Sequence, residues 1–333
     1  MLFDFPQATP QDSGFKPHVF PRLIKQINSG NFGKLDSLLV LRNGYLVFEG
    51  YFNGYKADHL HPIQSVSKSI QSILVGICLD QGLIKNLDEP IIQFFEEYQY
   101  LDWSGGKDKI TIRHLLCMTT GIQWNESEMP YQSFENQANQ LVLSSDWLAY
   151  ALSQPMEAKP GTIFNYSSAN PILFAGIIKK VSGLSNETFA LKYLFQPLDI
   201  NKLAIHRSVF SPEIIGDYEL VPKDLLKIGW LMLQKGKWNG NQLVSGNWVA
   251  QTLSNQFEIK PGMQEYGFFW WRKKCTLGNK EIWYIYAWGY GGQHIFLFPE
   301  LDLVFTTTAS YYNINQAFEP FEILEEYILL GLT

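Results

Sequence analysis

The sequence predicts a mixed α/β (α+β) fold in which one antiparallel sheet is flanked by helices and joined to a mainly helical lobe. Three observations lead to it. β-rich segments occur near the N-terminus, apolar residues recur at helical spacing through the middle of the chain, and β-rich segments separated by turn residues return in the last third. Strands that precede and follow a helical insert can pair in a single sheet, so we expect both ends of the chain to contribute to it.

The expected division of the chain follows from this order of elements. Residues 1–66 and 255–333 would form the sheet lobe, and residues 67–254 the mainly helical lobe. A chain of 333 residues is longer than a usual single small core requires, which agrees with two fused lobes in one domain. We expect the functional site between the lobes.

The first elements are a hairpin and a helix. Residues 37–54 read SLLVLRNGYLVFEGYFNG, and two β-rich runs flank Asn43-Gly44, a dipeptide typical of tight hairpin turns. Apolar residues then recur at helical spacing over 70–77. A helix is therefore expected to begin near Ser65.

The remaining elements are predicted from periodicity, caps and turn residues. Thr111 is a plausible helix cap, and Gly183 a plausible helix stop. Further helices are expected over 110–118, 171–182, 222–236 and about 315–330, and strands over 266–271, 281–288, 294–299 and 303–308.

Composition and charge exclude several classes of function. The net charge is −6 without long runs of one sign, and no basic patch is interleaved with aromatics, so we expect no nucleic-acid partner. No apolar run approaches the roughly 18 residues that span a bilayer, so we expect no transmembrane segment. The first residues lack a basic region followed by an apolar one. This predicts a cytoplasmic protein, unless a leader was removed and the protein is periplasmic. The oligomeric state stays open.

The cysteines and histidines do not predict a metal site. Cys78, Cys117 and Cys275 are few, odd in number and far apart, which disfavours a disulfide framework, a zinc site and a nucleophilic thiol. His59 and His61 lack a third ligand at a suitable spacing. A Ser-His-Asp triad on a G-x-S-x-G elbow has no counterpart here. We therefore predict neither a metal nor a cofactor.

A nucleophile with an adjacent base is suggested by Ser65-Val66-Ser67-Lys68, which matches the pattern S-x-x-K. The pattern also occurs over 13–16 and 104–107, but the first lies in a segment without periodicity and the second in a glycine turn. Only Ser65 precedes a strongly apolar helix.

The spacing gives this pair a chemical meaning. Residues three apart share a helix face, so the amine of Lys68 can approach the hydroxyl of Ser65. Serine needs a base to accept its proton, and lysine is a base only when its pKa falls, as burial and a helix N-terminus favour. The competing interpretation is that Ser65 caps the helix and Lys68 is solvated.

Two motifs in order resemble those of serine β-lactamases, DD-peptidases and their esterase relatives. HPIQSVSKSIQSILVGI is similar to the opening motif of that family, and KPGTIFNYSSANPILFAGIIKKVSG is similar to its second motif, usually Tyr-x-Asn. Tyr166 falls at the Tyr position and Ser168 at the Asn position. The resemblance implies that Tyr166 moves protons beside Ser65, while Ser168 departs from the usual amide. A core aromatic is the competing interpretation for Tyr166.

The third motif of the family, Lys/His-Thr/Ser/Gly-Gly, is resembled by AWGYGGQHIFLFPELDLVFTT. Tyr290-Gly291-Gly292 occupies the motif positions, and the amides of Gln293 and Ser65 would form the oxyanion hole. Tyr290 is a departure, because a neutral phenol cannot pair with a substrate carboxylate as lysine does. A glycine-rich turn is the competing interpretation.

The resemblance covers roughly residues 35–310 and implies a β-lactamase/DD-peptidase-like fold. The Tyr-Ser-Ser and Gly-Tyr-Gly-Gly-Gln segments resemble those of 6-aminohexanoate-dimer hydrolases and related carboxylesterases. Four tryptophans could line an apolar acyl pocket or pack in the core: Trp124, Trp270, Trp271 and Trp288.

We therefore expect a serine hydrolase that forms an acyl-enzyme on Ser65 with a small-molecule ester, amide or peptide substrate. Two alternatives remain. The first is a DD-peptidase or β-lactamase acting on peptidoglycan or β-lactams. The second is a catalytically silent binding or sensing module of the same fold.

Overall fold

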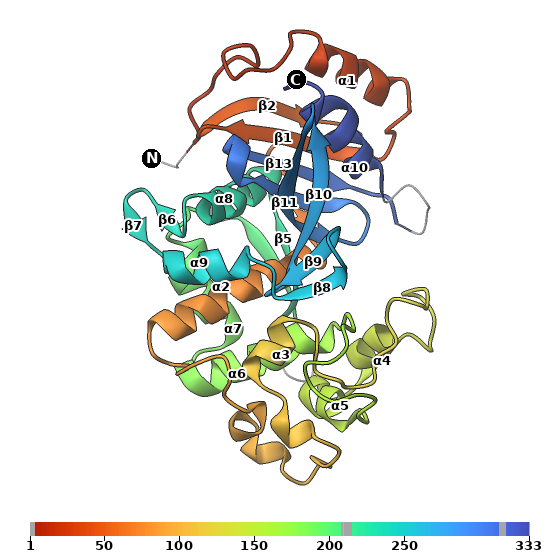
Figure 1. Ribbon diagram of the computed structural model, residues 1–333, viewed down its shortest axis with the longest axis vertical. Coiled ribbons are helices and arrows are strands. Elements are labelled where there is room, and N and C mark those ends of the chain that lie inside the picture. Colours follow the sequence, from red (N-terminus) through yellow and green to blue (C-terminus); the bar gives the residue numbers. More distant parts are fainter. Residues whose placement is uncertain (1–3, 208, 210–214, 313–317, 333) are drawn as a thin grey trace.

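The computed structural model describes residues 4–207, 209, 215–312 and 318–332. Figure 1 shows the main sheet with α1 and α10 towards one end of the molecule and α3 to α6 at the other, while α2, α8 and α9 lie between them. Both chain ends lie at the sheet end (Figure 1). This arrangement agrees with the mixed α/β fold and the antiparallel sheet expected from the sequence.

The main sheet joins the two ends of the chain. Among the described residues it has eight strands in the order β2-β1-β13-β12-β11-β10-β9-β8, and every neighbouring pair is antiparallel. The strands are β1 (Leu35–Arg42), β2 (Tyr45–Tyr51), β8 (Phe257–Lys260), β9 (Gln264–Gly267), β10 (Trp270–Leu277), β11 (Lys280–Gly289), β12 (Gln293–Phe298) and β13 (Leu303–Ala309).

The hairpin β1–β2 forms where the sequence predicts it. Asn43 and Gly44 have φ angles of 52° and 79°, and both central residues of a two-residue hairpin turn of this kind require positive φ. A larger side chain at Gly44 would be strained, and a Cβ there would also lie 3.3 Å from the ring of Trp230.

The helices expected at 110–118, 171–182 and 222–236 are present with shifted ends. Thr111 caps α3, where its side chain accepts a hydrogen bond from the backbone N–H of His114, and Gly183 ends α6 with a φ of 70°. The helices are α1 (Val19–Asn28), α2 (Val66–Asp80), α3 (Ile112–Leu116), α4 (Gln137–Leu143), α5 (Trp147–Ser153), α6 (Ala169–Ser182), α7 (Asn186–Ala190), α8 (Pro222–Leu233), α9 (Gly246–Thr252) and α10 (Glu319–Ile323). The last helix continues as a π-helix over Leu324–Leu329, and residues 315–317 of the expected helix lie outside the described residues.

One predicted strand is wrong. The run YGFFWW (266–271) is divided by a turn in which Phe268 and Phe269 have φ angles of 41° and 68°. β9 ends at Gly267 and β10 begins at Trp270, so the run forms the corner of a hairpin instead of one strand. Both phenylalanine rings are buried, which explains how an apolar sequence can form a turn.

Two helices of the segment 67–254 pack directly against the main sheet. α8 contacts β1, β12 and β13, and α2 contacts β11 and β12, so both helices lie against the sheet. A Cβ at Gly229 would be 2.6 Å from Val304 and 2.9 Å from Ile295, which shows how closely α8 approaches. Helices α3 to α6 lie at the end of the molecule opposite the sheet (Figure 1).

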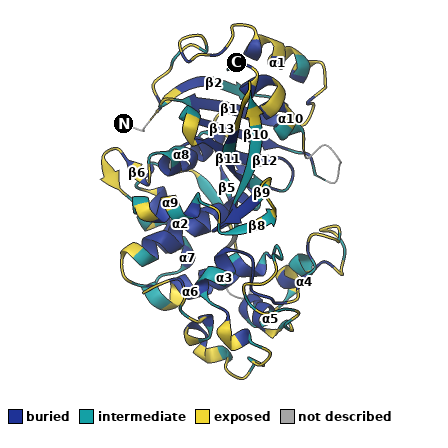
Figure 2. Ribbon diagram, in the orientation of Figure 1, coloured by how far each residue is buried: buried dark blue, intermediate teal, exposed yellow. Residues whose placement is uncertain are grey.

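A small second sheet brings a distant segment to the start of α2. It pairs β3 (His61–Pro62) with β5 (Ile215–Leu220) and β5 with β4 (Leu203–Arg207). β6 (Lys237–Trp238) and β7 (Asn241–Gln242) form a separate hairpin. Figure 2 shows buried residues concentrated in α2 and the central strands. Within the described ranges no helix combines the length and apolar character needed to cross a membrane.

Candidate active site

Ser65 lies at the junction between extended chain and α2. Gln64, the residue before it, has a φ of 53°, a conformation that non-glycine residues rarely adopt. Ser65 is the N-cap of α2, yet its side chain makes no capping hydrogen bond. The interpretation of Ser65 as a simple helix cap is therefore wrong, and its hydroxyl is available for other contacts.

Lys68 is directed at Ser65. Its Nζ donates to Ser65 Oγ at 2.8 Å and to Ser168 Oγ at 3.1 Å, and it lies 4.9 Å from the centre of the Tyr166 ring. The side chain is buried, because residues 66–78 of α2 are buried along their whole length. The solvated lysine of the competing interpretation is therefore wrong. The structure brings Ser65, Lys68, Tyr166 and Ser168 together as the sequence predicts.

The charge of Lys68 differs from the expectation. Burial acts to lower the pKa of Lys68, but the interaction with the Tyr166 side chain and the nearby carboxyl groups of Glu126 and Asp217 outweigh burial and raise that pKa above its ordinary value. Lys68 at rest is therefore an ammonium. The expectation of a lysine made neutral by its surroundings considered burial and the helix N-terminus, and it missed the two carboxylates.

Glu126 is a buried carboxylate that the sequence analysis missed. It follows α3 and accepts four hydrogen bonds, from the backbone N–H of Ser168 (2.7 Å), Ser168 Oγ (2.7 Å), Trp124 Nε1 (2.8 Å) and the hydroxyl of Tyr131 (3.0 Å). Its side chain thus fixes the residue at the Asn position of the second motif. No pattern in the sequence around 124–131 distinguishes this glutamate from its neighbour Glu128, which is exposed.

Asp217 is the second carboxyl group that the sequence analysis missed. It comes from β5, and its Oδ1 accepts hydrogen bonds from the Ser67 hydroxyl and from the backbone N–H of Tyr218 at 2.7 Å. Burial raises its pKa to about 6 against these hydrogen bonds and the nearby Lys68. The sequence gives no signal that Asp217 belongs to the site, because β5 reaches α2 only through the small second sheet.

The third motif is divided between the site and the core. Tyr290 and Gly291 line the cavity beside Ser65, while Gln293 and Gly292 are buried and do not line it. The Gln293 side chain donates to the carbonyl of Ala309 at 2.6 Å and accepts from the Ala309 N–H at 3.1 Å. These two hydrogen bonds tie the Gln293 side chain to β13 and do not involve its backbone N–H, which is the group expected in the oxyanion hole.

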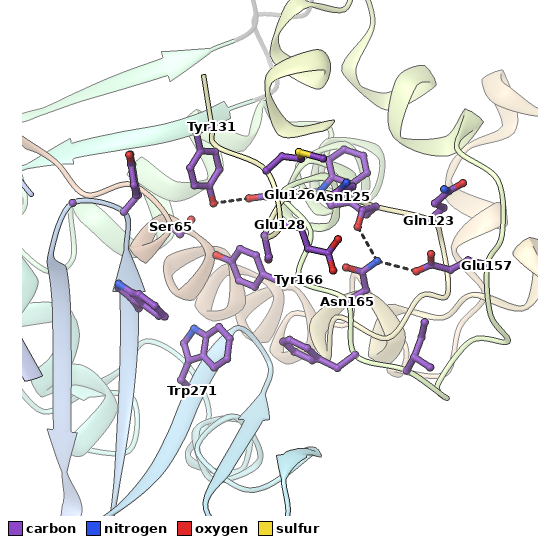
Figure 3. Close-up of a pocket in the computed structure, with 18 residues that line it drawn as sticks. Ser65, Gln123, Asn125, Glu126, Glu128, Tyr131, Glu157, Asn165, Tyr166 and Trp271 are labelled. Atoms are coloured by element: carbon purple, nitrogen blue, oxygen red, sulfur yellow. Dashed lines mark hydrogen bonds between the residues drawn. The ribbon is translucent and has the colours of Figure 1, made fainter. Parts of the chain in front are cut away.

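Two cavities meet at Ser65. One, of about 850 Å³, extends past Tyr166, Trp271 and Trp288, and the other, of about 630 Å³, extends past Lys68 and Asp217. Ser65, Glu126, Tyr131 and Tyr290 line both. Figure 3 shows Ser65 at the start of its helix, with Tyr131, Tyr166 and Trp271 around the first cavity.

Of the four tryptophans expected to line a pocket or pack in the core, three line the larger cavity and one is buried in the core. Trp124, Trp271 and Trp288 line the larger cavity, whereas Trp270 is fully buried in the core and does not. Trp271 stacks on Tyr166 with ring centres 5.9 Å apart, which holds the phenol in place.

Burial raises the pKa of Cys78 and Cys117 to about 12, so both thiols are protonated. In the part of the chain that the structure describes, no three His, Cys, Asp or Glu side chains gather as metal ligands.

Comparison with known proteins places these features in a family. A profile of the Beta-lactamase family matches residues 35–319. The chain is 27% identical over 300 residues to the 6-aminohexanoate-dimer hydrolase of Paenarthrobacter ureafaciens, covering 83% of this chain and 72% of that protein. It is 31% identical over 142 residues to a β-lactamase of Escherichia coli, covering 43% of this chain and 34% of that protein.

Solved structures agree on the fold. A Bacillus anthracis protein named as a candidate 6-aminohexanoate-dimer hydrolase superposes with a TM-score of 0.79 at 19% identity, covering 98% of this chain and 86% of that one. The octameric penicillin-binding protein homologue of Pyrococcus abyssi superposes with a TM-score of 0.70 at 18% identity, covering 94% of this chain and 77% of that one. The resemblance read from the motifs is confirmed: the chain belongs to the Beta-lactamase family of hydrolases.

Proposed function

We propose that this protein is a serine hydrolase that cleaves an ester or amide through an acyl-enzyme on Ser65. The observation that carries the proposal is the 2.8 Å contact between Lys68 Nζ and Ser65 Oγ at the meeting point of two cavities. The relative that hydrolyses 6-aminohexanoate dimers, which are amides, supports an amide or ester substrate. The hydroxyl of Ser65 is the attacking group.

Proton transfer involves Lys68 and Tyr166 as a pair. The three N–H bonds of an ammonium leave no lone pair to accept a proton, so the resting pair must first lose one proton. Ser65 Oγ then bonds to the carbonyl carbon while its proton passes to the pair. The pair returns that proton to the leaving oxygen or nitrogen as the old bond breaks, and water repeats the sequence to release the acid.

The developing negative charge on the carbonyl oxygen needs two N–H donors. As the N-cap residue, Ser65 keeps its own backbone N–H outside the hydrogen-bond ladder of α2. We propose that the second donor comes from the turn between β11 and β12, where Tyr290 lines both cavities. The motif predicts that this donor is the backbone N–H of Gln293, which begins β12 directly after the turn, and the hydrogen bonds of Gln293 to β13 involve only its side chain.

The two cavities give the substrate two directions from Ser65. We propose that the larger, aromatic cavity holds one part of the substrate and the smaller cavity, beside Lys68, holds the other. A proton donor beside the smaller cavity suits the departing alcohol or amine. The acyl group would then lie against Trp271 and Trp288.

The test is intact-mass detection of adducts after exposure to p-nitrophenyl esters, short amides and β-lactams. We expect a mass increase equal to the acyl group in the wild type and none in Ser65→Ala. Lys68→Ala should lose acylation by about 100-fold or more while keeping its circular dichroism spectrum. Unchanged ester turnover in Lys68→Ala would contradict the mechanism, adducts from β-lactams alone would favour a penicillin-recognising enzyme, and tight binding without adducts would favour a silent module.

A further inference from the structure

Glu126 combines full burial with a complete set of partners. It is 1% exposed, and its two oxygens accept the four hydrogen bonds given above. Removing a carboxylate from water is costly unless such donors compensate it, so a satisfied and ionised Glu126 is a built feature of the site. Ser168 provides two of its four donors.

The direction of these hydrogen bonds is fixed by the chemistry of the groups. An ionised carboxylate only accepts, so the single hydroxyl proton of Ser168 points to Glu126 Oε1. The lone pairs of Ser168 Oγ then face Lys68 Nζ, 3.1 Å away, and can only accept from it. One N–H of Lys68 is thereby held on Ser168 in either charge state of the amine.

This constraint decides where a neutral Lys68 can accept a proton. Its lone pair cannot face Ser168, so it must lie towards the groups on its other side, Ser65 Oγ at 2.8 Å and the phenol of Tyr166. We propose that Glu126 is a positioning residue, which acts through the Ser168 hydroxyl to direct the amine of Lys68 at Ser65. The inference rests on the proposed function, since it concerns the base of that reaction.

The charges around Lys68 agree with this arrangement. Three groups face the amine: Tyr166 from the chain before α6, Glu126 from the chain after α3, and Asp217 from β5. Tyr131 faces Glu126 from the other side, and burial together with the Glu126 carboxylate raises the pKa of the Tyr131 hydroxyl. Glu126 therefore also favours the ammonium form of Lys68, and its removal should make Lys68 lose its proton at lower pH.

The experiment measures the rate of Ser65 acylation by a p-nitrophenyl ester against pH. For Glu126→Gln we expect the ascending limb to move to lower pH by about one unit and the plateau to fall about tenfold or more, because an opposite charge and an acceptor are both lost. Ser168→Ala should lower the plateau while moving the ascending limb less, because it removes the hydroxyl that links Glu126 to Lys68 and keeps the charge of Glu126. Ser168→Thr, which keeps the hydroxyl, should restore the plateau.

The matched control is Glu265→Gln. This residue is another buried glutamate, paired with Arg272 on the neighbouring strand, and should leave the profile unchanged. An unshifted limb in Glu126→Gln, or an undiminished plateau in Ser168→Ala, would overturn the proposal. So would an identical shift in Glu265→Gln.

A second measurement does not depend on turnover. In Ser65→Ala protein labelled with ¹³C-lysine, the Cε resonance of Lys68, assigned by its absence in Lys68→Arg, should titrate at lower pH when Glu126→Gln is added. An unchanged midpoint would overturn the inference about Glu126. Absence of any Ser65-dependent acylation in the wild type would instead overturn the proposed function, so the two failures are distinguishable.

Discussion

Two carboxyl groups lie near Lys68 and are stabilised to very different degrees. Glu126 accepts four hydrogen bonds, whereas Asp217 accepts two, from Ser67 and Tyr218, and has a pKa raised to about 6 by burial. Within the described residues Asp217 forms no ion pair at salt-bridge distance. Ionised Asp217, at the edge of the site, therefore destabilises the folded state at neutral pH.

Replacing Asp217 by Asn should stabilise the protein above pH 6. A carboxyl whose folded-state pKa lies above its unfolded value of 3.8 loses stability as the pH rises from about 4 through 6. The amide keeps an oxygen for Ser67 and Tyr218. We expect a gain of about 1–2 kcal/mol in the free energy of unfolding at pH 8, discounted for partial exposure, and none at pH 3.5.

Urea unfolding at the two pH values measures this difference. The gain should disappear progressively between pH 6 and pH 4. A variant that is equally stable or less stable at pH 8 would contradict the assignment of Asp217 as a strained carboxylate.

At the level of elements, α2 holds the reactive pair in place because it is packed on all sides. Residues 66–78 are buried, and Trp248 of α9 lies against Gly76 so closely that a Cβ there would be 2.2 Å from the indole ring. The indole also donates from Nε1 to the carbonyl of Ser72 at 3.1 Å. The ring therefore cannot move aside without losing a hydrogen bond.

Gly76→Ala should accordingly be destabilising. We expect a loss of about 1–3 kcal/mol from the crowding of a well-packed helix contact, with reduced acylation because α2 carries Ser65 and Lys68. Urea unfolding and the acylation rate provide the measurements. The matched control is Gly176→Ala in α6, where the added methyl would lie 3.0 Å from Leu148 and 3.1 Å from the ring of Phe95, much less close than the 2.2 Å at Gly76, and should cost less. Equal costs at both positions would contradict the packing argument.

Elements with local signals could be predicted from the sequence, and those set by distant contacts could not. The hairpin at Asn43-Gly44, the cap at Thr111 and the start of α2 near Ser65 each depend on neighbouring residues. β4 and β5 had no such signal, because their pairing with β3 is long-range. The turn at Phe268–Phe269 could not be predicted because a local signal was present but misleading: its apolar residues resemble a strand.

The same distinction between local signals and long-range contacts applies to the residues of the site. Ser65 and Lys68 are three residues apart, so helix geometry predicts their contact, and Tyr166 and Ser168 were found through the motif. Glu126 and Asp217 reach Lys68 only through tertiary packing, which is why the charge of Lys68 was misjudged. The motif predicts an oxyanion-hole role for the backbone N–H of Gln293, and the structure adds that the side chain of this residue bonds to β13.

At the scale of the whole molecule, a buried histidine of the main sheet is packed among aromatic rings. His294 on β12 lies against Trp288 and Phe296, with ring centres 6.3 Å and 4.9 Å apart, and its Nδ1 lies 3.3 Å from Thr307 Oγ1. Burial lowers the pKa of His294 to about 3, against a hydrogen bond with the backbone of Gly292. The ring is therefore neutral in the folded state at any pH above that value.

His294→Gln should weaken the dependence of stability on acid. The depressed folded-state pKa means that stability is present above about 6.5 and is lost as the pH falls towards 3, by up to about 4 kcal/mol. The variant lacks this loss, although it is less stable at pH 7 because the stacked ring is gone. Urea unfolding between pH 7 and 4 measures the slope, and exposed His18→Gln is the control. An unchanged slope in His294→Gln would contradict the prediction.

The pairing of β1 with β13 has a consequence for biosynthesis. The hydroxyls of Ser37 and Thr308 are 2.7 Å apart although their residues are separated by 271 positions. While the ribosome is still making the intervening chain, β1 and β2 form only a two-stranded ribbon, which is marginally stable in water. The apolar strands of the nascent polypeptide therefore stay exposed until its last strand emerges. We expect chaperone binding to be strongest at this stage.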